Sequence, residues 1–116
     1  MNYKKNEIKE HFEDFINDID KDTLKELIED DELHHEAFGT DYYIIGTYKA
    51  KQWLSDKVFD IIEFIKEWEQ DNFGELYTDL TNPEKVVNMY AYIIGQQIVN
   101  DYYYAEGIWD EECEAK

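Results

Sequence analysis

The sequence predicts an all-α fold, a compact bundle of about four to five amphipathic helices in a single domain over residues 1–116. Most apolar residues recur at a spacing near 3.6, and no linker rich in Pro, Gly or Ser divides the chain. The chain can also supply a core, since 43% of its residues are hydrophobic and 16% aromatic. A chain of this length buries roughly two-thirds of its unfolded surface.

The first two helices are predicted from apolar periodicity and capping residues. The second is expected to begin with Asp22 or Thr23 as its cap and to fade near residues 33–38. The first should run for about four turns, because one face carries apolar residues at helical spacing. These residues are Ile8, Phe12, Phe15, Ile16 and Ile19.

A third and a fourth helix are expected in the middle of the chain. Thr40 is the predicted cap of the third, although residues 42–45 also suit a short strand. Ser55 is the predicted cap of the fourth, which should end at Gly74. The face of the third helix is Tyr42, Ile45, Gly46, Lys49, Ala50 and Trp53. That of the fourth is Val58, Ile61, Ile62, Ile65 and Trp68.

The last helix has the clearest start. Thr81 and Asn82 offer a cap, and Pro83 and Glu84 suit a first turn. Residues 75–80 remain as a loop or an isolated short strand. The inner face of the last helix is predicted to be Val87, Tyr90, Ala91, Ile94 and Ile98, continuing toward Tyr102.

The charge of this chain is extreme for a folded protein. The chain has 29 acidic residues and eleven basic ones, all of them lysines, which gives a formal net charge of -18. Solubility alone calls for a net charge of only about 2–8, and the excess destabilises a compact state by self-repulsion. The excess therefore favours a functional interpretation in which the surface imitates a polyanion.

The acids form stripes on the predicted helices. Carboxylates three or four residues apart on a helix lie about 5–6 Å from each other, comparable to the spacing of phosphates along a DNA strand. The predicted partner-binding, phosphate-mimicking residues of the first helix are Glu7, Glu10, Glu13, Asp14 and Asp18. A second group is Glu29, Asp30, Asp31, Glu32 and Glu36, and a third is Asp56, Asp60, Glu63 and Glu67. The tail adds Asp110, Glu111 and Glu112.

Each stripe taken alone also fits the solvated face of an amphipathic helix. An ordinary solvated face, however, interleaves Lys with Glu, because like charges at this spacing cost a few tenths of a kcal/mol per pair. Residues 101–114 contain six acids and no base. The shared sign of the stripes therefore favours mimicry of DNA.

Other features narrow the class of function. The chain has no Gly-rich phosphate loop, no Gly-x-Ser-x-Gly motif and no arginine, so we expect no enzyme and no cofactor. Nucleic acid and a negative membrane surface would both repel it, which leaves basic proteins as partners. The single Cys113 and the lack of an apolar signal segment lead us to expect a cytoplasmic protein.

Two candidate metal sites in the sequence have simpler explanations. Residues 18–29 place acids at positions 1, 3, 5, 9 and 12 of a calcium loop, but Thr23 stands where the loop needs glycine. His34 and His35 are adjacent and would point about 100° apart on a helix, so they cannot share one ion there. A cap at a helix C-terminus is the simpler role for these histidines.

Several features in order resemble those of the Ocr-type antirestriction proteins of phages. They are an Asp31-Glu32-Leu33-His34 segment, a Tyr42-Tyr43 pair and a late helix from a Pro and acid start through Val86, Tyr90 and Ile98 into an acidic aromatic tail. The resemblance implies a dimeric mimic of B-form DNA that occupies the DNA groove of type I restriction and modification enzymes. The tail departs from the pattern, since Cys113 interrupts its run of acids.

We therefore expect a phage anti-defence protein that blocks a DNA-binding defence or host enzyme and does not itself bind nucleic acid. The alternatives are an acidic interaction module for a basic partner and a calcium-binding regulator. A homodimer is also expected, through aromatic surface left exposed around Tyr42, Ile45, Trp53 and the Tyr102-Tyr103-Tyr104 run.

Overall fold

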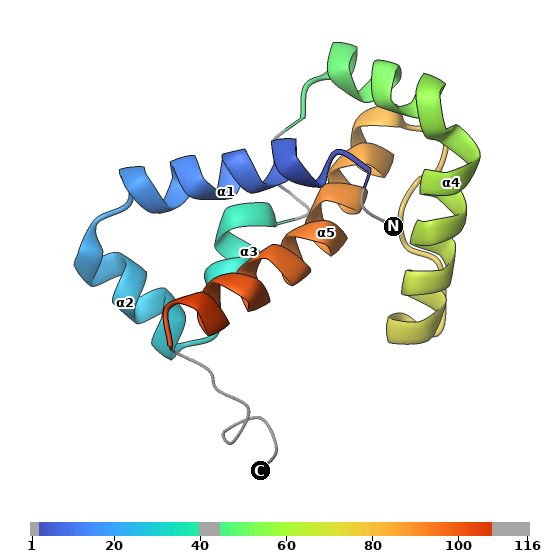
Figure 1. Ribbon diagram of the computed structural model, residues 1–116. Coiled ribbons are helices and arrows are strands. Elements are labelled where there is room, and N and C mark those ends of the chain that lie inside the picture. Colours follow the sequence, from blue (N-terminus) through green and yellow to red (C-terminus); the bar gives the residue numbers. More distant parts are fainter. Residues whose placement is uncertain (1–2, 40–44, 108–116) are drawn as a thin grey trace.

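The computed structural model describes residues 3–39 and 45–107, and within these ranges every regular element is a helix (Figure 1). This confirms the predicted all-α class, and residues 75–80 form a loop with no strand. The predicted cap Thr40 and residues 42–44 lie outside the described residues. The helices are α1 (Lys5–Asp18), α2 (Lys21–Glu29), α3 (Leu33–Phe38), α4 (Thr47–Phe73) and α5 (Pro83–Ala105).

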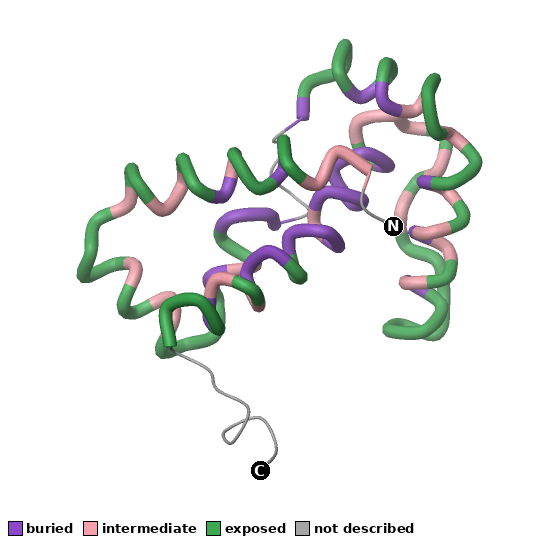
Figure 2. Tube along the Cα trace, in the orientation of Figure 1, coloured by how far each residue is buried: buried purple, intermediate pink, exposed green. Residues whose placement is uncertain are grey.

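Helix α5 is the centre of the fold. Helices α1, α3 and α4 all pack against it, and α2 packs on α3 (Figure 1). Buried residues follow α5 along most of its length, whereas the outer sides of α1, α2 and α4 are exposed (Figure 2). No helix in the described ranges is long and apolar enough to cross a membrane.

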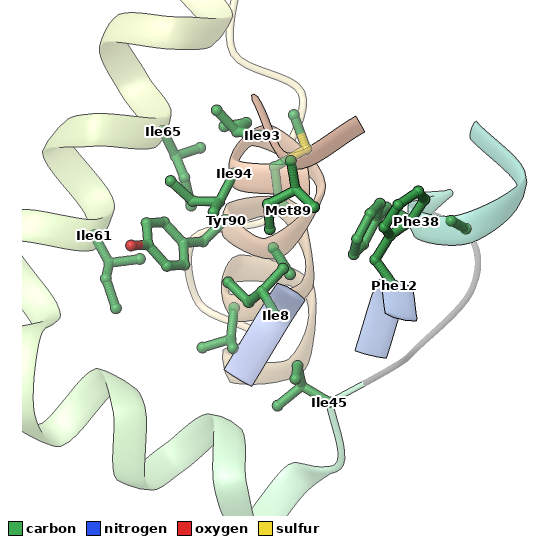
Figure 3. Close-up of a cluster of buried hydrophobic side chains, with 14 of the residues drawn as sticks. Ile8, Phe12, Phe38, Ile45, Ile61, Ile65, Met89, Tyr90, Ile93 and Ile94 are labelled. Carbon is green, nitrogen blue, oxygen red and sulfur yellow. The ribbon is translucent and has the colours of Figure 1, made fainter. Parts of the chain in front are cut away.

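The core is built around Tyr90, whose side chain is fully buried. Ile61 and Ile65 of α4 approach its ring from one side, and Ile8 of α1 lies nearby (Figure 3). The Tyr90 hydroxyl donates a hydrogen bond to the backbone oxygen of Tyr3. All five predicted inner-face residues of the last helix are buried, as expected from their spacing.

A buried amide joins α5 to the chain that precedes α4. Asn88 is 3% exposed. Its Oδ1 accepts from the backbone N–H of Ile45 at 2.9 Å, and its Nδ2 donates to the Ile45 oxygen at 3.0 Å and to the Glu84 oxygen at 2.8 Å. Because both backbone groups of Ile45 are satisfied, this irregular segment can enter the core without an unpaired polar group.

The predicted start of the second helix was wrong by two or three residues. Asp20 is the cap of α2, and its carboxylate accepts from the backbone N–H groups of Asp22 and Thr23. An aspartate is a strong capping residue, and here its extended backbone turns the chain out of α1. The predicted start of α5 is confirmed, with Asn82 as the cap and Pro83 in the first turn.

The second helix also does not fade into residues 33–38. It ends at Glu29, and Asp31 takes a positive φ of 57° before α3 begins at Leu33. Helix α3 then lies so close to α5 that a Cβ on Gly95 would come within 2.5 Å of the Phe38 ring. Glycine is therefore required at this crossing.

The predicted third and fourth helices form one helix with a kink. Ser55 lies inside α4 and does not cap it, and Gly46 precedes the first turn. The backbone leaves helical geometry at Lys57, where φ is -142° and ψ is 36°. Trp53 and Ile61 are buried four residues on either side of Lys57, which is exposed. The bend lets both apolar stretches reach the core while the lysine stays in water.

The predicted end of α4 is confirmed. Gly74 has a positive φ of 77°, and its N–H donates to the Gln70 oxygen at 3.0 Å. This left-handed residue is the usual glycine stop of a helix, where a side chain would be strained.

Candidate functional site

The acidic stripe of α1 lies on the outer side of the fold. Its five predicted residues are all exposed, while Ile8 and Phe12 on the opposite side are buried. Glu7 forms an ion pair with Lys4, with 3.3 Å between Nζ and Oε1. In the described part of the chain, the rest of the stripe forms no ion pair within 4 Å; these residues are Glu10, Glu13, Asp14 and Asp18.

A groove of about 830 Å³ separates the second half of α1 from α3. Asp14 and Asp18 border it from α1, and Glu36 borders it from α3. His11 is fixed at its edge by a 3.1 Å hydrogen bond between Nε2 and the Ala37 oxygen. The groove joins the α1 stripe to one member of the second predicted acidic group. Its remaining lining is Phe15, Ile19, His35, Ala37 and Gly39.

A second groove, of about 750 Å³, lies between the start of α1 and the first half of α4. Glu7 and Glu10 border it from α1, and Asp56 borders it from α4. Lys4 and Lys49 also line this groove, so it is the least acidic part of the surface described so far. It places the beginnings of the α1 and α4 stripes side by side.

Tyr3 contacts two residues that line the second groove, Trp53 and Asp56. Its hydroxyl lies 3.5 Å from a carboxylate oxygen of Asp56, and burial together with this carboxylate raises the pKa of Tyr3. The Lys4 ammonium lies 5.7 Å from the centre of the Tyr3 ring and 5.9 Å from that of Trp53. These contacts hold the residues just before α1 against α4.

The α4 stripe begins at Asp56, one residue before the kink at Lys57, and continues beyond it. Asp56, Asp60, Glu63 and Glu67 are exposed, and Glu63 pairs with Lys66 at 3.8 Å. Eleven residues separate the first and last members of this stripe, as they do in α1, so each spans about 17 Å of helix axis. The structure thus connects the two stripes through the second groove.

The remaining predicted acids stand at the turn between α2 and α3. Glu29, Asp30, Asp31 and Glu32 are all exposed there. Acids at the end of α2 oppose its dipole, whereas Glu32, directly before α3, complements that of the next helix. The predicted tail residues Asp110, Glu111 and Glu112 lie outside the described residues.

We call the connected surface the acidic band, comprising Glu36, the α1 stripe and the α4 stripe. One groove joins Glu36 to the end of α1, and the other joins the start of α1 to α4. The described residues contain only three ion pairs, and two of them involve members of the band. Most acids of the band therefore form no ion pair within 4 Å among the described residues.

The calcium-loop alternative does not fit the structure. Nine of its twelve residues form α2, Lys21–Glu29, and a continuous helix cannot wrap its carboxylates around one ion. Asp20 is committed to capping that helix. Across the described ranges, no three His, Cys, Asp or Glu side chains converge in a way that could hold a metal.

The predicted place of the two adjacent histidines at a helix C-terminus holds for His35, which lies in the last turn of α3, and not for His34. Both lie in α3, with His35 exposed and His34 half-buried against α5. His34 Nε2 lies 2.7 Å from the Tyr92 oxygen, and the centres of the two rings lie 4.2 Å apart with a tilt of 32° between their planes. Burial lowers the pKa of His34, with the hydrogen bond to Tyr92 acting in the opposite direction.

The aromatic surface proposed for a dimer is mostly core. Ile45, Trp53 and Tyr103 are buried, and of the named residues that the structure describes only Tyr104 is counted as exposed, at 37%. The predicted exposure was wrong at Ile45, Trp53 and Tyr103, because their side chains pack into the hydrophobic core. Tyr42 lies outside the described residues.

Sequence reasoning missed a different surface, at the end of α4. Phe73, Leu76 and Tyr77 are exposed there, beside a buried carboxylate, Glu69. The signal was present in the sequence. Glu69 follows Ile61 and Ile65 at four-residue spacing, so an acid stands on the inward face of the helix.

No family model, curated protein or solved structure matches this chain. The resemblance to the Ocr-type proteins has no support beyond the sequence features given above.

Proposed function

We propose that this chain is a non-enzymatic mimic of DNA, a phage anti-defence protein that blocks the DNA-binding groove of a restriction and modification enzyme or a related nucleic-acid-binding enzyme. Its place of action would be the cytoplasm of the host cell. The observation that carries the proposal is the acidic band, in which two helical stripes and Glu36 meet through two grooves.

The spacing within the band supports this proposal. Carboxylates three or four residues apart on a helix lie about 5–6 Å from each other, and each stripe extends for about 17 Å. A protein that recognises DNA holds Lys and Arg side chains at positions complementary to phosphates and gains free energy when counterions are released. Exposed carboxylates at similar spacing can engage the same side chains.

The lack of neutralisation also supports it. Like charges three or four residues apart cost stability, and a surface with no partner gains nothing in return. Glu10, Asp14 and Asp18 follow one another at four-residue spacing with no cation within 4 Å in the described chain. A cationic partner would supply the missing charge.

Competition with DNA tests the proposal. The probe is the methyltransferase core of a type I restriction and modification enzyme, bound to a fluorescent duplex of about 30 base pairs. We expect the protein to displace the duplex, and the inhibition to weaken markedly between ~50 and 200 mM salt. Simultaneous binding of duplex and protein, or inhibition unaffected by salt, contradicts the proposal.

A matched pair of variants separates pattern from net charge. Glu10→Gln/Asp14→Asn/Asp18→Asn removes three charges from the band and is expected to weaken inhibition by about tenfold or more. The control removes three exposed acids outside the band: Asp22→Asn/Glu26→Gln/Glu106→Gln. We expect it to weaken inhibition by less than about threefold. Equal losses of inhibition in the two variants would show that inhibition depends on net charge and not on the arrangement of the band.

The acidic interaction module remains a second candidate, because the exposed side chains at the end of α4 offer recognition that does not depend on charge. Under that function the partner holds this protein and DNA together. A ternary complex in the same assay would favour it over mimicry.

A further inference from the structure

Three large apolar side chains project into solvent where α4 ends. Phe73 is 48% exposed, Leu76 47% and Tyr77 65%. We call these three residues the aromatic tip. Two other exposed aromatic residues of α4, Tyr48 and Phe59, form no ring contact within the described residues, whereas the tip residues are close in sequence and share ring contacts.

The rings of the tip are supported by the core. The Phe73 ring lies edge to face with the rings of Tyr77 and Trp68, with 5.0 Å and 5.3 Å between the ring centres. Trp68 in turn contacts the ring of Tyr92 on α5 at 6.3 Å. The exposed rings are thus the outer end of a series that begins on the central helix, and this restricts their motion.

A buried carboxylate holds the loop that carries the tip. Glu69 is 1% exposed, and its Oε1 accepts from the backbone N–H groups of Tyr77 and Thr78 at 3.3 Å each. Its Oε2 accepts from the Thr78 hydroxyl at 2.8 Å. Burying a carboxylate is costly even when it is hydrogen-bonded. Here the hydrogen bonds that Glu69 accepts fix the backbone of Tyr77, while the Tyr77 side chain stays in solvent. A binding residue that is held in place before its partner arrives loses less conformational entropy on binding.

The surroundings of the tip are mostly negative, with Lys85 the cation that acts on Asp79. Residues 67–84 contain no lysine, and the exposed acids near the tip include Asp71, Glu75 and Asp79. Hydrogen bonds from Thr81 hold the pKa of Asp79 below its usual value, so this carboxylate stays ionised. Glu67, the last member of the acidic band, lies four residues before Asp71, so the band leads to the tip.

These features specify the chemistry of an occupant. Aromatic faces attract cations, and carboxylates at the rim add to that attraction. Arginine satisfies both, because its planar guanidinium stacks on rings and pairs with carboxylates in a forked geometry, whereas lysine offers a hydrated point charge. An anionic or purely apolar occupant would leave the acids at the rim uncompensated.

We propose that the aromatic tip is a docking site for an arginine-bearing segment of a partner protein, with the guanidinium stacked on Phe73 or Tyr77 and paired with the carboxylates beside them. The inference deepens the proposed function by naming a contact of its partner, and rests on that function only for the expectation that the partner is a basic protein. Salt would weaken the affinity contributed by the acidic band and by the carboxylates beside the tip, whereas the stacking on the rings would be less sensitive to salt.

Two synthetic peptides of about twelve residues test the proposal, one alternating Arg with Gly and the other Lys with Gly. Binding to the full chain is measured by fluorescence anisotropy over a series of salt concentrations. We expect the arginine peptide to bind more tightly. Phe73→Ala/Tyr77→Ala should weaken it by about fivefold or more, with the slope of affinity against salt unchanged because no charge is removed.

The control is Tyr48→Ala/Phe59→Ala, which removes two rings of α4 that are more exposed than those of the tip, at 76% and 81%. It should change the affinity by less than about twofold. Tyr77→Ala alone gives a second reading with the least risk to folding, and circular dichroism checks all variants. Equal losses in the tip and control variants, equal affinity for both peptides, or no binding of the arginine peptide would overturn the proposal.

Two further outcomes identify the cause of a failure. If sedimentation shows a dimer that the tip variant dissolves, the tip binds a second copy of this chain and the proposal is wrong. If the protein fails to displace duplex from the methyltransferase but the tip variant still loses the arginine peptide, the DNA mimicry fails and the docking site stands.

Discussion

Helices α5 and α1 are neighbours in the fold with opposite relations to water. Twelve of the 23 residues of α5 are buried, and three carry charge. In α1 only Ile8 and Phe12 are buried among 14 residues, and seven carry charge. The two helices pack against each other, yet one is enclosed by the chain and the other faces outward (Figure 2).

The difference separates stability from the proposed function. Side chains of α5 touch three other helices, so replacing them should change the free energy of unfolding. Acids of α1 contact mainly water, so replacing them should leave the fold intact and change what a partner sees. Each prediction below tests this division, beginning with the largest expected effect.

Tyr90→Ala is expected to lower the free energy of unfolding by about 3–5 kcal/mol, because it leaves a cavity where α1, α4 and α5 meet. This is a large share of the roughly 5–15 kcal/mol typical of a domain. Urea denaturation followed by circular dichroism measures it. Tyr90→Phe keeps the ring and removes the hydrogen bond to the Tyr3 oxygen, so it should lose only about 1 kcal/mol.

The matching substitution in α1 is Glu13→Ala. Glu13 is exposed and forms no ion pair among the described residues, so we expect a change within about 0.5 kcal/mol. If Glu13→Ala destabilised the protein as much as Tyr90→Ala, the outer face of α1 would be structural and the division between the helices would fail.

Gly95→Ala is expected to destabilise the protein by about 1–2 kcal/mol, although alanine is the better helix former by about 1 kcal/mol. The new Cβ would lie 2.5 Å from the Phe38 ring. That ring is 2% exposed and lies 5.9 Å from the ring of Phe12, so it has little room to move. The exposed neighbour Gln96→Ala serves as the control and should be nearly neutral.

A stabilised Gly95→Ala variant would mean that the crossing of α3 and α5 is looser than described. Combining it with Phe38→Leu sharpens the test. The smaller side chain should relieve the contact, so the double variant is expected to lose less stability than the two single losses added together.

The sequence predicts α1 and α5 well because each keeps a regular apolar period and α5 has a strong start at Asn82 and Pro83. It fails where a charged residue interrupts the apolar face of a helix. Lys57 stands in line with Trp53 and Ile61, and a period alone cannot tell whether such a helix breaks, bends or buries the charge. The bend depends on packing against α5.

The sequence predicted which acids of the candidate site are exposed, but not which acidic stripes lie next to each other. Helical spacing places the acids outside, since burying so many charges is prohibitive. Which stripes meet depends on how the helices cross, and Glu36 reaches the α1 stripe only because α3 forms its own short helix. The aromatic tip depends on Glu69 accepting hydrogen bonds from a loop up to nine residues away in sequence, which no local pattern encodes.

The band variant Glu10→Gln/Asp14→Asn/Asp18→Asn is expected to stabilise the protein by about 0.5–1 kcal/mol at low salt. It removes two like-charge pairs at four-residue spacing, and Asp18 also opposes the dipole at the end of α1. The melting temperature should rise by about 2–5 °C. Added salt should raise that of the wild type more than that of the variant. A lower melting temperature in the variant would show that these acids are paired in the fold.

The smallest effect concerns His34, which joins α3 to α5. Burial lowers the pKa of His34 in the folded protein below its unfolded value of about 6.5. Above that pH the imidazole is neutral in both states. As the pH falls below it, the unfolded chain takes up a proton that the folded protein resists, so the stability associated with neutral His34 is lost as the pH falls through the folded pKa.

We therefore expect the wild type to lose more melting temperature than His34→Gln between about pH 7.5 and 5.5, by an amount on the order of 1–3 °C. The glutamine amide can still donate to the Tyr92 oxygen, so the variant removes the titration while keeping the hydrogen bond. His35→Gln removes the exposed imidazole of the same helix and should behave as the wild type does. If His34→Gln and the wild type lost the same melting temperature, the contact between α3 and α5 would be indifferent to protonation, and burial would not govern this histidine.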